Sequence, residues 1–375
     1  MCKEKIAYVT LLDQYHPGIY DSQVIDVCNY LNDNFDVEVQ LIAFLSIKEL
    51  WRSDAKKIIK SKCKNALVLP AFPKLRYFKL TQFLLATCLM FKPKKALICR
   101  NVFATQIGLF CRKFGLVKLV AFDGRSALSA EIKEYDVFPV PYFKKHIAEW
   151  ERASVMRTNF QIAVSAALID YWKDCYSYES KNNIIMPCTL ASNVDWENIE
   201  QKETSQIKVV YAGSNAPWQG FEEISSFLRM HPNVSCTLLT KQSKTTDLMQ
   251  IEFGERLKIQ WVNMAEIPVL MAKHDYGLLL RPESVTNQVA SPGKFAEYLM
   301  CGLKVIITKN LGDYSNFVEN NNCGLVWDRM QTLDLKKTLN EDKGYNKSLA
   351  KKFFTKQSVI NHAAYQKLID FIIQS

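Results

Sequence analysis

The sequence predicts an α/β protein with two Rossmann-like, doubly wound units. Short apolar runs typical of buried parallel strands alternate with segments of helical periodicity along the chain. Polar loops that contain glycine or proline join several of these runs to the helix that follows. A length of 375 residues also favours two domains, and the apolar content is sufficient for two cores.

The first domain is expected to span 1–188. Its strands are predicted from short apolar runs at 6–12, 37–44, 66–69, 96–99, 119–122 and 160–165. Helices are expected near 23–32, 56–64, 74–91, 104–114, 147–156 and 166–174, the last of them capped by Ser165. A polar stretch without periodicity follows at 188–199, and we place the domain boundary there.

The second domain is expected to span 189–355. It opens with a strand at 207–212, a loop that begins at Gly213 and ends at Gly220, and a helix from Phe221. Further strands are predicted at 236–240, 257–262, 276–280 and 305–308, with a helix opening at 267–271. A last helix, at 357–373, is predicted after the second domain.

The stretch 275–308 organises this domain. After its first strand, the polar segment 281–291 lacks helical periodicity and is predicted to be a loop. Ser291 and Pro292 suit the N-cap and first position of a helix that Gly302 ends. A helix N-terminus at the carboxyl end of a strand favours an anion. Lys294 and Glu297 share one face of its first turn, where a cation suits a phosphate and a carboxylate suits ribose hydroxyls.

This stretch resembles the donor-binding signature of GT-B glycosyltransferases, specifically the retaining family-four group that builds bacterial capsule, O-antigen and exopolysaccharide. The matching residues are Asn287, Ser291, Pro292, Lys294, Glu297, Tyr298, Gly302, Val305 and Ile306. The resemblance implies two Rossmann-like domains that face a central cleft, with the acceptor on 1–188 and a nucleotide-diphosphate sugar on 189–355. It also implies that a C-terminal helix within 356–375 crosses back to the first domain.

The resemblance also implies roles for individual residues. Lys294 and Arg281 would stabilise the departing diphosphate, with Lys241 as a weaker third candidate, and Glu297 would bind the ribose. The other expected donor-binding residues are Gly213, Ser214, Glu283, Asn287, Ser291, Pro292 and Gly293.

The sequence departs from the family pattern at three positions. Many relatives carry an arginine and a lysine where this chain has Ser214 and Gln219, and a second glutamate where it has Val289. Phosphate neutralisation must therefore come from other cations.

The first domain offers fewer candidates. Asp123 and Arg125, in the segment FDGRS, resemble an aspartate and arginine at the cleft edge of the family's first domain, in a variant order. Asp123 is expected to bind an acceptor hydroxyl and to take part in catalysis, Arg125 to bind the acceptor, and Gly18 to lie in a loop facing the cleft. Asp123 as a turn or helix cap, and Gly18 as a plain turn residue, are the alternatives.

The charge is concentrated in the first half. Residues 1–188 carry 27 Lys and Arg against 18 Asp and Glu, and 55–122 contain no acidic residue. A basic surface favours an anionic partner, such as a lipid-linked saccharide or an anionic membrane. The segment 74–91 suits either an interfacial helix or a helix packed on the sheet.

Several classes are disfavoured. Eleven scattered cysteines, the lack of a signal-like opening and short apolar runs favour a cytosolic protein, peripheral on the inner face of the membrane if it binds lipid. No D-x-D pair is present, which agrees with a site that needs no metal or other cofactor. Two alternatives stay open: an epimerase or inactive scaffold with this fold, and a nucleic-acid-binding protein, although no aromatic-basic interleaving supports the latter.

Overall fold

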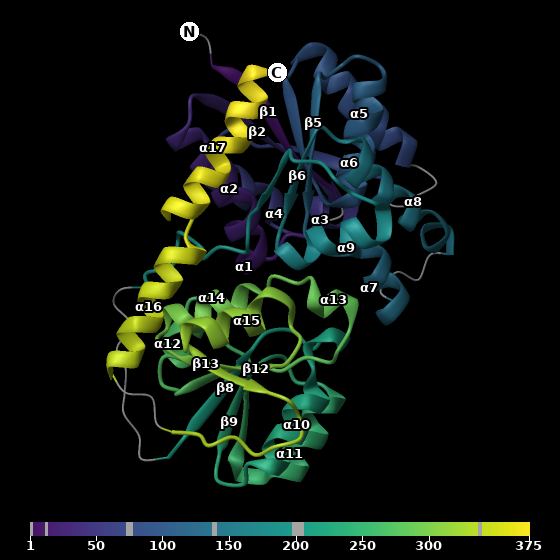
Figure 1. The fold of residues 1–375 in the computed structure, drawn as a ribbon. Coiled ribbons are helices and arrows are strands. Elements are labelled where there is room, and N and C mark those ends of the chain that lie inside the picture. Colours follow the sequence, from purple (N-terminus) through teal and green to yellow (C-terminus); the bar gives the residue numbers. More distant parts are fainter. Residues whose placement is uncertain (1–2, 12–13, 73–77, 137–140, 197–205, 337–339) are drawn as a thin grey trace. The chain divides into compact units, whose positions relative to one another are not determined.

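The computed structural model describes residues 3–11, 14–72, 78–136, 141–196, 206–336 and 340–375. The chain divides into two compact units. Unit 1 comprises Met1–Pro187 together with Val359–Ser375, and unit 2 comprises Cys188–Ser358. Figure 1 shows the elements of both units, and each unit is described by itself.

Unit 1 is built on a parallel sheet. Across the described residues its order is β3-β2-β1-β4-β5-β6-β7. The strands are β1 (Glu4–Leu11), β2 (Val37–Ser46), β3 (Leu67–Ala71), β4 (Ala96–Arg100), β5 (Leu119–Gly124), β6 (Phe160–Ala163) and β7 (Asn183–Ile185). The chain runs outward from β1 in one direction and then from β4 in the other, so the carboxyl ends of β1 and β4 form a switch point, where such sheets bind ligands.

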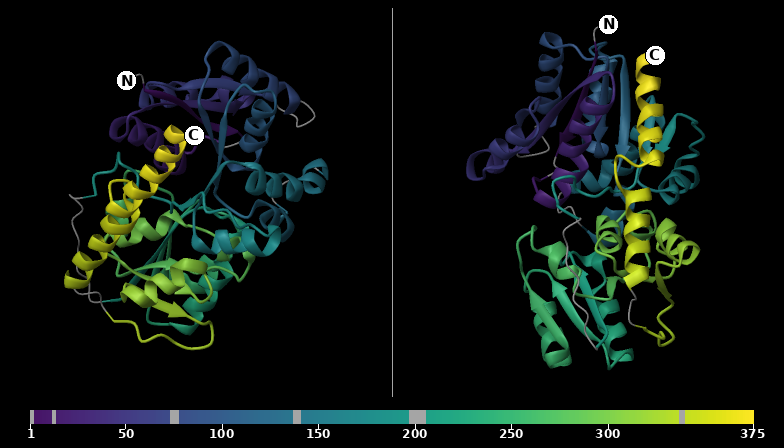
Figure 2. Two further views of the ribbon diagram at one scale, coloured as in Figure 1. Left: turned by 45° about the horizontal axis from the view of Figure 1, so that its top comes forward. Right: turned by 90° about the vertical axis from the view of Figure 1, so that its left-hand side faces the viewer.

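Helices follow the strands of unit 1 and cover both faces of its sheet (Figures 1 and 2). They are α1 (Pro17–Tyr20), the π-helix η1 (Asp21–Ile25), α2 (Asp26–Asn34), α3 (Ile47–Arg52), α4 (Ala55–Lys62), α5 (Phe78–Phe91), α6 (Asn101–Lys113), α7 (Leu128–Tyr135), α8 (Pro141–Arg157), α9 (Ala166–Tyr176) and α17 (Val359–Gln374). Ser165 caps α9 by accepting from Leu168 N, as predicted. Helix α17 buries Tyr365, Leu368 and Ile372 in the same core as β1.

Unit 2 repeats this architecture. In the part of the chain that is described, its parallel sheet has the order β10-β9-β8-β11-β12-β13, and the switch point lies between β8 and β11. The strands are β8 (Lys208–Ala212), β9 (Ser235–Leu239), β10 (Leu257–Gln260), β11 (Tyr276–Leu279), β12 (Lys304–Thr308) and β13 (Gly324–Trp327). The two parallel sheets confirm the predicted α/β class.

The helices of unit 2 pack on two faces of this sheet. They are η3 (Pro217–Gln219), α10 (Phe221–Met230), α11 (Lys244–Phe253), η4 (Gly254–Arg256), α12 (Ile267–Met271), α13 (Val285–Gln288), α14 (Gly293–Met300), α15 (Gly312–Asn321) and α16 (Asn340–Phe354). Side chains of α14, α15 and α16 form one core with the sheet, and side chains of α10 and α11 form a second core.

Tyr298 fixes α14 on the sheet. Its ring lies where a Cβ on Gly277 would be, so only glycine at that position of β11 admits the ring. The Tyr298 hydroxyl accepts from Ala212 N at 3.0 Å and donates to Leu278 O at 3.2 Å, which joins it to β8 and β11. The N-terminus of α14 is thereby held at the switch point.

Two local predictions in the organising stretch are wrong. The segment 281–291 is not entirely loop, because Ser284 caps the short helix α13 by accepting from Asn287 N at 3.2 Å. Ser291 does not cap α14, whose N-cap is Pro292. The Ser291 hydroxyl instead accepts from Cys188 N at 2.8 Å and bonds to the Tyr314 hydroxyl. Its oxygen is therefore used within unit 2 away from the helix.

The amphipathic segment expected at 74–91 is helical from Phe78, and residues 74–77 lie outside the described part of the chain. Helix α5 does pack on the unit, since Leu85 and Leu89 are buried. It also leaves Met90 and Phe91 68% and 81% exposed. The helix therefore packs on the unit, as one of the two alternatives predicted, and carries exposed apolar side chains at its C-terminal end.

Candidate functional site

The candidate site of unit 2 lies at the carboxyl ends of β8 and β11. Four segments meet there: the loop that begins at Gly213, the short helix η3, the chain after β11, and the first turn of α14. Polar side chains from the last two of these segments converge on Gln219 of η3, which is 9% exposed.

Lys294 points from the first turn of α14 to this point. Its Nζ donates to Gln219 Oε1 at 2.8 Å and lies 3.9 Å from the centre of the Tyr211 ring. Burial, with the nearby Arg281 as the second cause, lowers the pKa of the Lys294 ammonium well below its ordinary value, and Glu297 opposes that shift. The ammonium is thus held in a poorly solvated place against a neutral amide and an aromatic face.

Arg281 brings a second cation to the same oxygen. The side chain is buried, and its two terminal nitrogens donate to Asn287 Oδ1 at 3.2 Å and to Gln219 Oε1 at 3.5 Å. Asn287 is itself oriented by a bond from its Nδ2 to Pro282 O at 2.9 Å. Helix α13 therefore aims the guanidinium at the point where Lys294 also arrives.

The shared acceptor carries no charge. Gln219 Oε1 receives Lys294, Arg281 and, at 3.2 Å, the hydroxyl of Tyr211. Lys294 is half-buried and Arg281 is buried, and both contact one neutral oxygen. The electrostatic potential at this point is therefore positive, which favours binding of an anionic group with several oxygens. Together with the N-terminus of α14, this arrangement suits a phosphate or diphosphate.

Gly213 makes room for Lys294. A Cβ at Gly213 would lie 2.7 Å from Lys294 Nζ, and the residue has a φ of 156°. We expect Gly213→Ala to push the ammonium aside and to weaken nucleoside diphosphate binding about 10-fold, the effect of one charged hydrogen bond. Titration calorimetry measures the affinity.

Gly254→Ala is the matched control for this variant. Gly254 also has a positive φ, of 55°, but a Cβ there would meet nothing within 4 Å. Both variants are expected to lose about 1 kcal/mol of stability through backbone strain, while only Gly213→Ala weakens binding. Equal affinities in the two variants would contradict the arrangement around Lys294.

The remaining donor candidates lie in different surroundings. Glu297 is half-buried one turn after Lys294, and burial raises the pKa of its carboxyl while Lys294 opposes the shift. Ser214 offers its carbonyl to the Tyr211 hydroxyl at 2.7 Å. Glu283 is exposed and accepts from Asn310 at 3.4 Å. Lys241 places its Nζ 4.9 Å from the centre of the Trp261 ring.

The structure thus brings Gly213, Arg281, Asn287 and Lys294 together. Arg281 and Lys294 meet at Gln219, which was not predicted as a site residue. The signal in the sequence was its place directly before Gly220, where the family pattern that the sequence resembles has a lysine.

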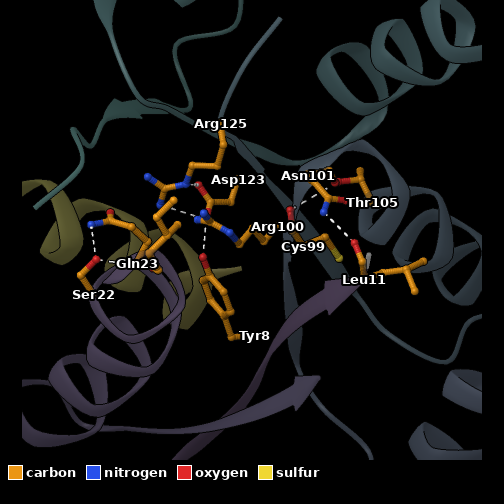
Figure 3. Close-up of polar contacts among 11 residues, drawn as sticks. Tyr8, Leu11, Ser22, Gln23, Cys99, Arg100, Asn101, Thr105, Asp123 and Arg125 are labelled. Atoms are coloured by element: carbon orange, nitrogen blue, oxygen red, sulfur yellow. Dashed lines mark hydrogen bonds and ion pairs between the residues drawn. The ribbon is translucent and has the colours of Figure 1, made fainter. Parts of the chain in front are cut away.

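Unit 1 holds a separate polar cluster at the end of β5 (Figure 3). Asp123 is 0% exposed. Its Oδ2 accepts from Arg125 Nη2 at 3.1 Å and from the Tyr8 hydroxyl, and its Oδ1 forms an ion pair with Arg125 Nε at 2.8 Å. Arg100 Nη1 lies 3.8 Å from the same carboxylate. Burial, followed by the charge of Asp123, raises the pKa of Tyr8 well above its ordinary value.

The structure brings together some, but not all, of the site residues predicted in the first domain. Arg125 lies beside Asp123 as expected, whereas Tyr8 and Arg100 were not expected to join them. Both Asp123 oxygens already contact protein groups, Oδ2 through hydrogen bonds and Oδ1 through the ion pair with Arg125, so in this structure the carboxylate orients its neighbours. Gly18 lies apart from these contacts and accepts from the Ser22 hydroxyl at 2.7 Å.

Neither unit presents a metal centre in its described residues, where no group of three or more His, Cys, Asp or Glu side chains is arranged to hold a metal ion.

No protein-family model and no curated protein matches the sequence. Solved structures do match over nearly the whole chain. HepE from Anabaena, in complex with UDP, is 14% identical with a TM-score of 0.68 and covers 98% of this chain and 100% of its own. The lipopolysaccharide outer core galactosyltransferase WaaB is 12% identical with a TM-score of 0.69 and coverages of 98% and 99%. A putative UDP-N-acetylglucosamine 2-epimerase from Listeria monocytogenes is 11% identical with a TM-score of 0.56 and coverages of 98% and 96%.

These identities are too low to assign an activity, but the coverage and the two parallel sheets agree with the prediction from the organising stretch. The chain has the two-domain α/β GT-B fold seen in these glycosyltransferases.

Proposed function

We propose that this protein is a glycosyltransferase that moves a sugar from a nucleotide-diphosphate sugar to a saccharide acceptor. The observation that carries the proposal is the convergence of Lys294 and Arg281 on one neutral oxygen at the switch point of unit 2. HepE, which shares the fold, has been crystallised with UDP and with UDP and glucose. A bound diphosphate would bring negative charge to both cations.

The proposed chemistry follows from that charge. Transfer breaks the bond between the anomeric carbon and a phosphate oxygen and forms a bond from that carbon to an acceptor hydroxyl oxygen, whose proton passes to the departing diphosphate. Negative charge grows on the diphosphate as it leaves. Lys294, Arg281 and the N-terminus of α14 would stabilise this charge in a poorly solvated site. We propose that these groups suffice without a metal or other cofactor.

Glu297 is proposed to orient the donor. Its carboxylate lies one turn into α14 and would accept hydrogen bonds from the two ribose hydroxyls. Retention of the anomeric configuration is part of the proposal through the resemblance of the sequence to family-four enzymes, and this chain presents no residue that we assign as a nucleophile.

The acceptor is proposed to bind unit 1. The basic stretch 55–122 suits an anionic acceptor such as a lipid-linked oligosaccharide, and the pathway would be capsule, O-antigen or exopolysaccharide synthesis. No helix among the described residues is both long and apolar enough to cross a membrane. We propose peripheral binding at the cytoplasmic face through α5, on which Met90 and Phe91 are exposed.

Liposome pelleting tests this membrane contact. The double variant Met90→Ser, Phe91→Ser is expected to reduce pelleting with anionic vesicles at least about 5-fold, because burial of each side chain in the interface contributes about 1–2 kcal/mol. Met330→Ser, in unit 2, is the control, since Met330 is 84% exposed but lies outside the basic stretch. Equal pelleting of all three proteins would remove the membrane contact from the proposal.

Lys92 is exposed and follows directly after Met90 and Phe91 in the sequence. Its neighbours are less available, because Lys94 is buried and Lys95 donates to Glu4 at 2.9 Å. Vesicle binding is therefore expected to depend more on Lys92 than on Lys94 or Lys95.

Release of nucleoside diphosphate from a panel of nucleotide sugars tests the function itself. Wild-type protein is expected to release diphosphate from one donor, and Glu297→Ala is expected to raise KM about 10- to 100-fold through loss of charged hydrogen bonds. Glu255→Ala, an exposed glutamate on η4, serves as the control. Release by wild type and equal KM values for all three proteins would contradict the role of Glu297.

The same panel tests the second candidate. The match to a putative epimerase shows that proteins of another activity share this fold. An epimerase would convert the sugar without consuming an acceptor or accumulating diphosphate. An inactive scaffold would leave every nucleotide sugar unchanged.

A further inference from the structure

We propose that the Gln219 side chain is a displaceable placeholder for the donor diphosphate, holding Lys294 and Arg281 together until the diphosphate takes its place. This inference rests on the proposed function and adds a step to it. It assigns a role to a residue that departs from the family pattern, where a lysine is usual.

The hydrogen bonds of Gln219 support this role. Its Oε1 accepts from Lys294 at 2.8 Å, from Tyr211 at 3.2 Å and from Arg281 at 3.5 Å. The single proton of the Tyr211 hydroxyl also points to Ser214 O at 2.7 Å, so the oxygen serves mainly the two cations, and its contact with Arg281 is at the limit of a hydrogen bond. The oxygen therefore gathers the two cations without neutralising either of them.

A diphosphate would satisfy these donors better. Its oxygens are charged and numerous, and hydrogen bonds between ions are shorter and about twice as strong as those with a neutral partner. Burial already lowers the pKa of Lys294, which indicates that its charge is poorly compensated in this arrangement. Exchange of a neutral oxygen for an anionic one is thus favourable at both cations.

The backbone allows the exchange to occur by side-chain movement alone. Gln219 ends η3 and is followed by Gly220, which has a φ of 75°. A Cβ at Gly220 would lie 2.1 Å from Leu280 O and 2.9 Å from Arg281 Cα, so this part of the loop is fitted closely to the end of β11. Because all three bonds go to one terminal atom, rotation of the Gln219 side chain would release both cations together.

The placeholder role predicts that the site selects ligands that carry a diphosphate. Displacement of the Gln219 side chain costs free energy, and a ligand binds well only if its own contacts with Lys294 and Arg281 exceed that cost. A diphosphate reaches both cations and can do so, whereas a nucleoside without phosphate gains nothing from the exchange. The placeholder thus favours diphosphate-bearing donors over neutral molecules of similar shape.

Two substitutions at Gln219 test the proposal with inorganic pyrophosphate and the nucleoside diphosphates of adenine, guanine, uracil and thymine as titrants. Gln219→Glu makes the placeholder anionic, so that its carboxylate competes with the diphosphate for hydrogen bonds from Lys294 and Arg281. We therefore expect the affinity for diphosphate to fall at least about 30-fold. Gln219→Ala removes the placeholder, and we expect affinity to be unchanged or to rise a few-fold. Gln357→Glu, which adds the same charge at an exposed position of unit 2, is expected to behave as wild type.

The outcomes separate this inference from the proposed function. If Gln219→Ala weakens binding as much as Gln219→Glu, the side chain is a ligand or a support for the loop, and the placeholder role is overturned. If wild type fails to bind but Gln219→Ala binds, the placeholder role is supported in a stronger form. If folded wild type, Gln219→Ala and Gln357→Glu all fail to bind any titrant, both the placeholder role and the proposed function are contradicted.

Discussion

Lys294→Met is expected to lower kcat/KM for sugar transfer by about 10²- to 10³-fold, the usual effect of removing one group that stabilises charge in the transition state. Methionine keeps the length and apolar stem of the side chain, so the packing over Tyr211 and Gly213 should persist while the charge is lost. Lys258→Met, an exposed lysine on β10, is the control. A change of less than about 3-fold at Lys294 would show that the diphosphate is stabilised elsewhere.

The pH profile adds a second signature to this variant. Because the pKa of Lys294 is lowered by burial and by Arg281, kcat/KM should decline on the alkaline side at a pH below the ordinary pKa of lysine. Lys294→Arg should keep its charge and remove that decline, even if its activity is reduced.

The same shift affects stability with a defined sign. The folded protein binds the Lys294 proton more weakly than the unfolded chain does, because the folded pKa is the lower one. The charged lysine therefore costs stability at pH values below its folded pKa, and this cost disappears as pH rises to the unfolded pKa. Bound diphosphate should remove the cost by raising the pKa, with proton uptake measurable by calorimetry in buffers of different ionisation enthalpy.

Asp123→Asn is expected to lower the free energy of unfolding by about 3–5 kcal/mol, the cost of breaking a buried ion pair from one side. The asparagine keeps the shape but leaves the buried Arg100 and the largely buried Arg125 without their shared carboxylate. Urea unfolding measures the loss. Asp36→Asn is the control, because the pair of Asp36 with Lys3 is exposed and contributes about 0–1 kcal/mol.

This experiment also separates two roles for Asp123. A residue that only bound an acceptor hydroxyl would lose activity and keep its stability. A loss of less than about 1 kcal/mol, a size typical of surface substitutions and single hydrogen bonds, would contradict the orienting role that the contacts indicate.

Much of the fold follows from local sequence signals. The runs 6–12 and 37–44 are apolar enough to predict β1 and β2, because a strand buried on both faces requires such composition. Elements with weaker signals were missed. Strand β13 is only four residues long, and α13 depends on Ser284 as a cap within a segment that otherwise looks like a loop.

In the candidate site, too, residues of one sequence segment were predicted, whereas contacts between distant segments were not. Lys294 and Arg281 were predicted because they stand within one strand–loop–helix segment. Gln219 lies 75 residues from Lys294, and Tyr8 lies 115 residues from Asp123, so no local pattern relates either pair. Such contacts arise when parallel strands bring their carboxyl ends to one edge of a sheet.

The most direct test of the account is a calorimetric titration of nucleoside diphosphates into wild type, Lys294→Met and Lys258→Met. We predict that at least one diphosphate binds wild type and Lys258→Met with equal affinity, and that its binding to Lys294→Met is weaker by about 10-fold or more. Equal binding by all three proteins would place the diphosphate away from α14. Absence of binding to folded wild-type protein would contradict the assignment of a nucleotide-sugar site to this unit.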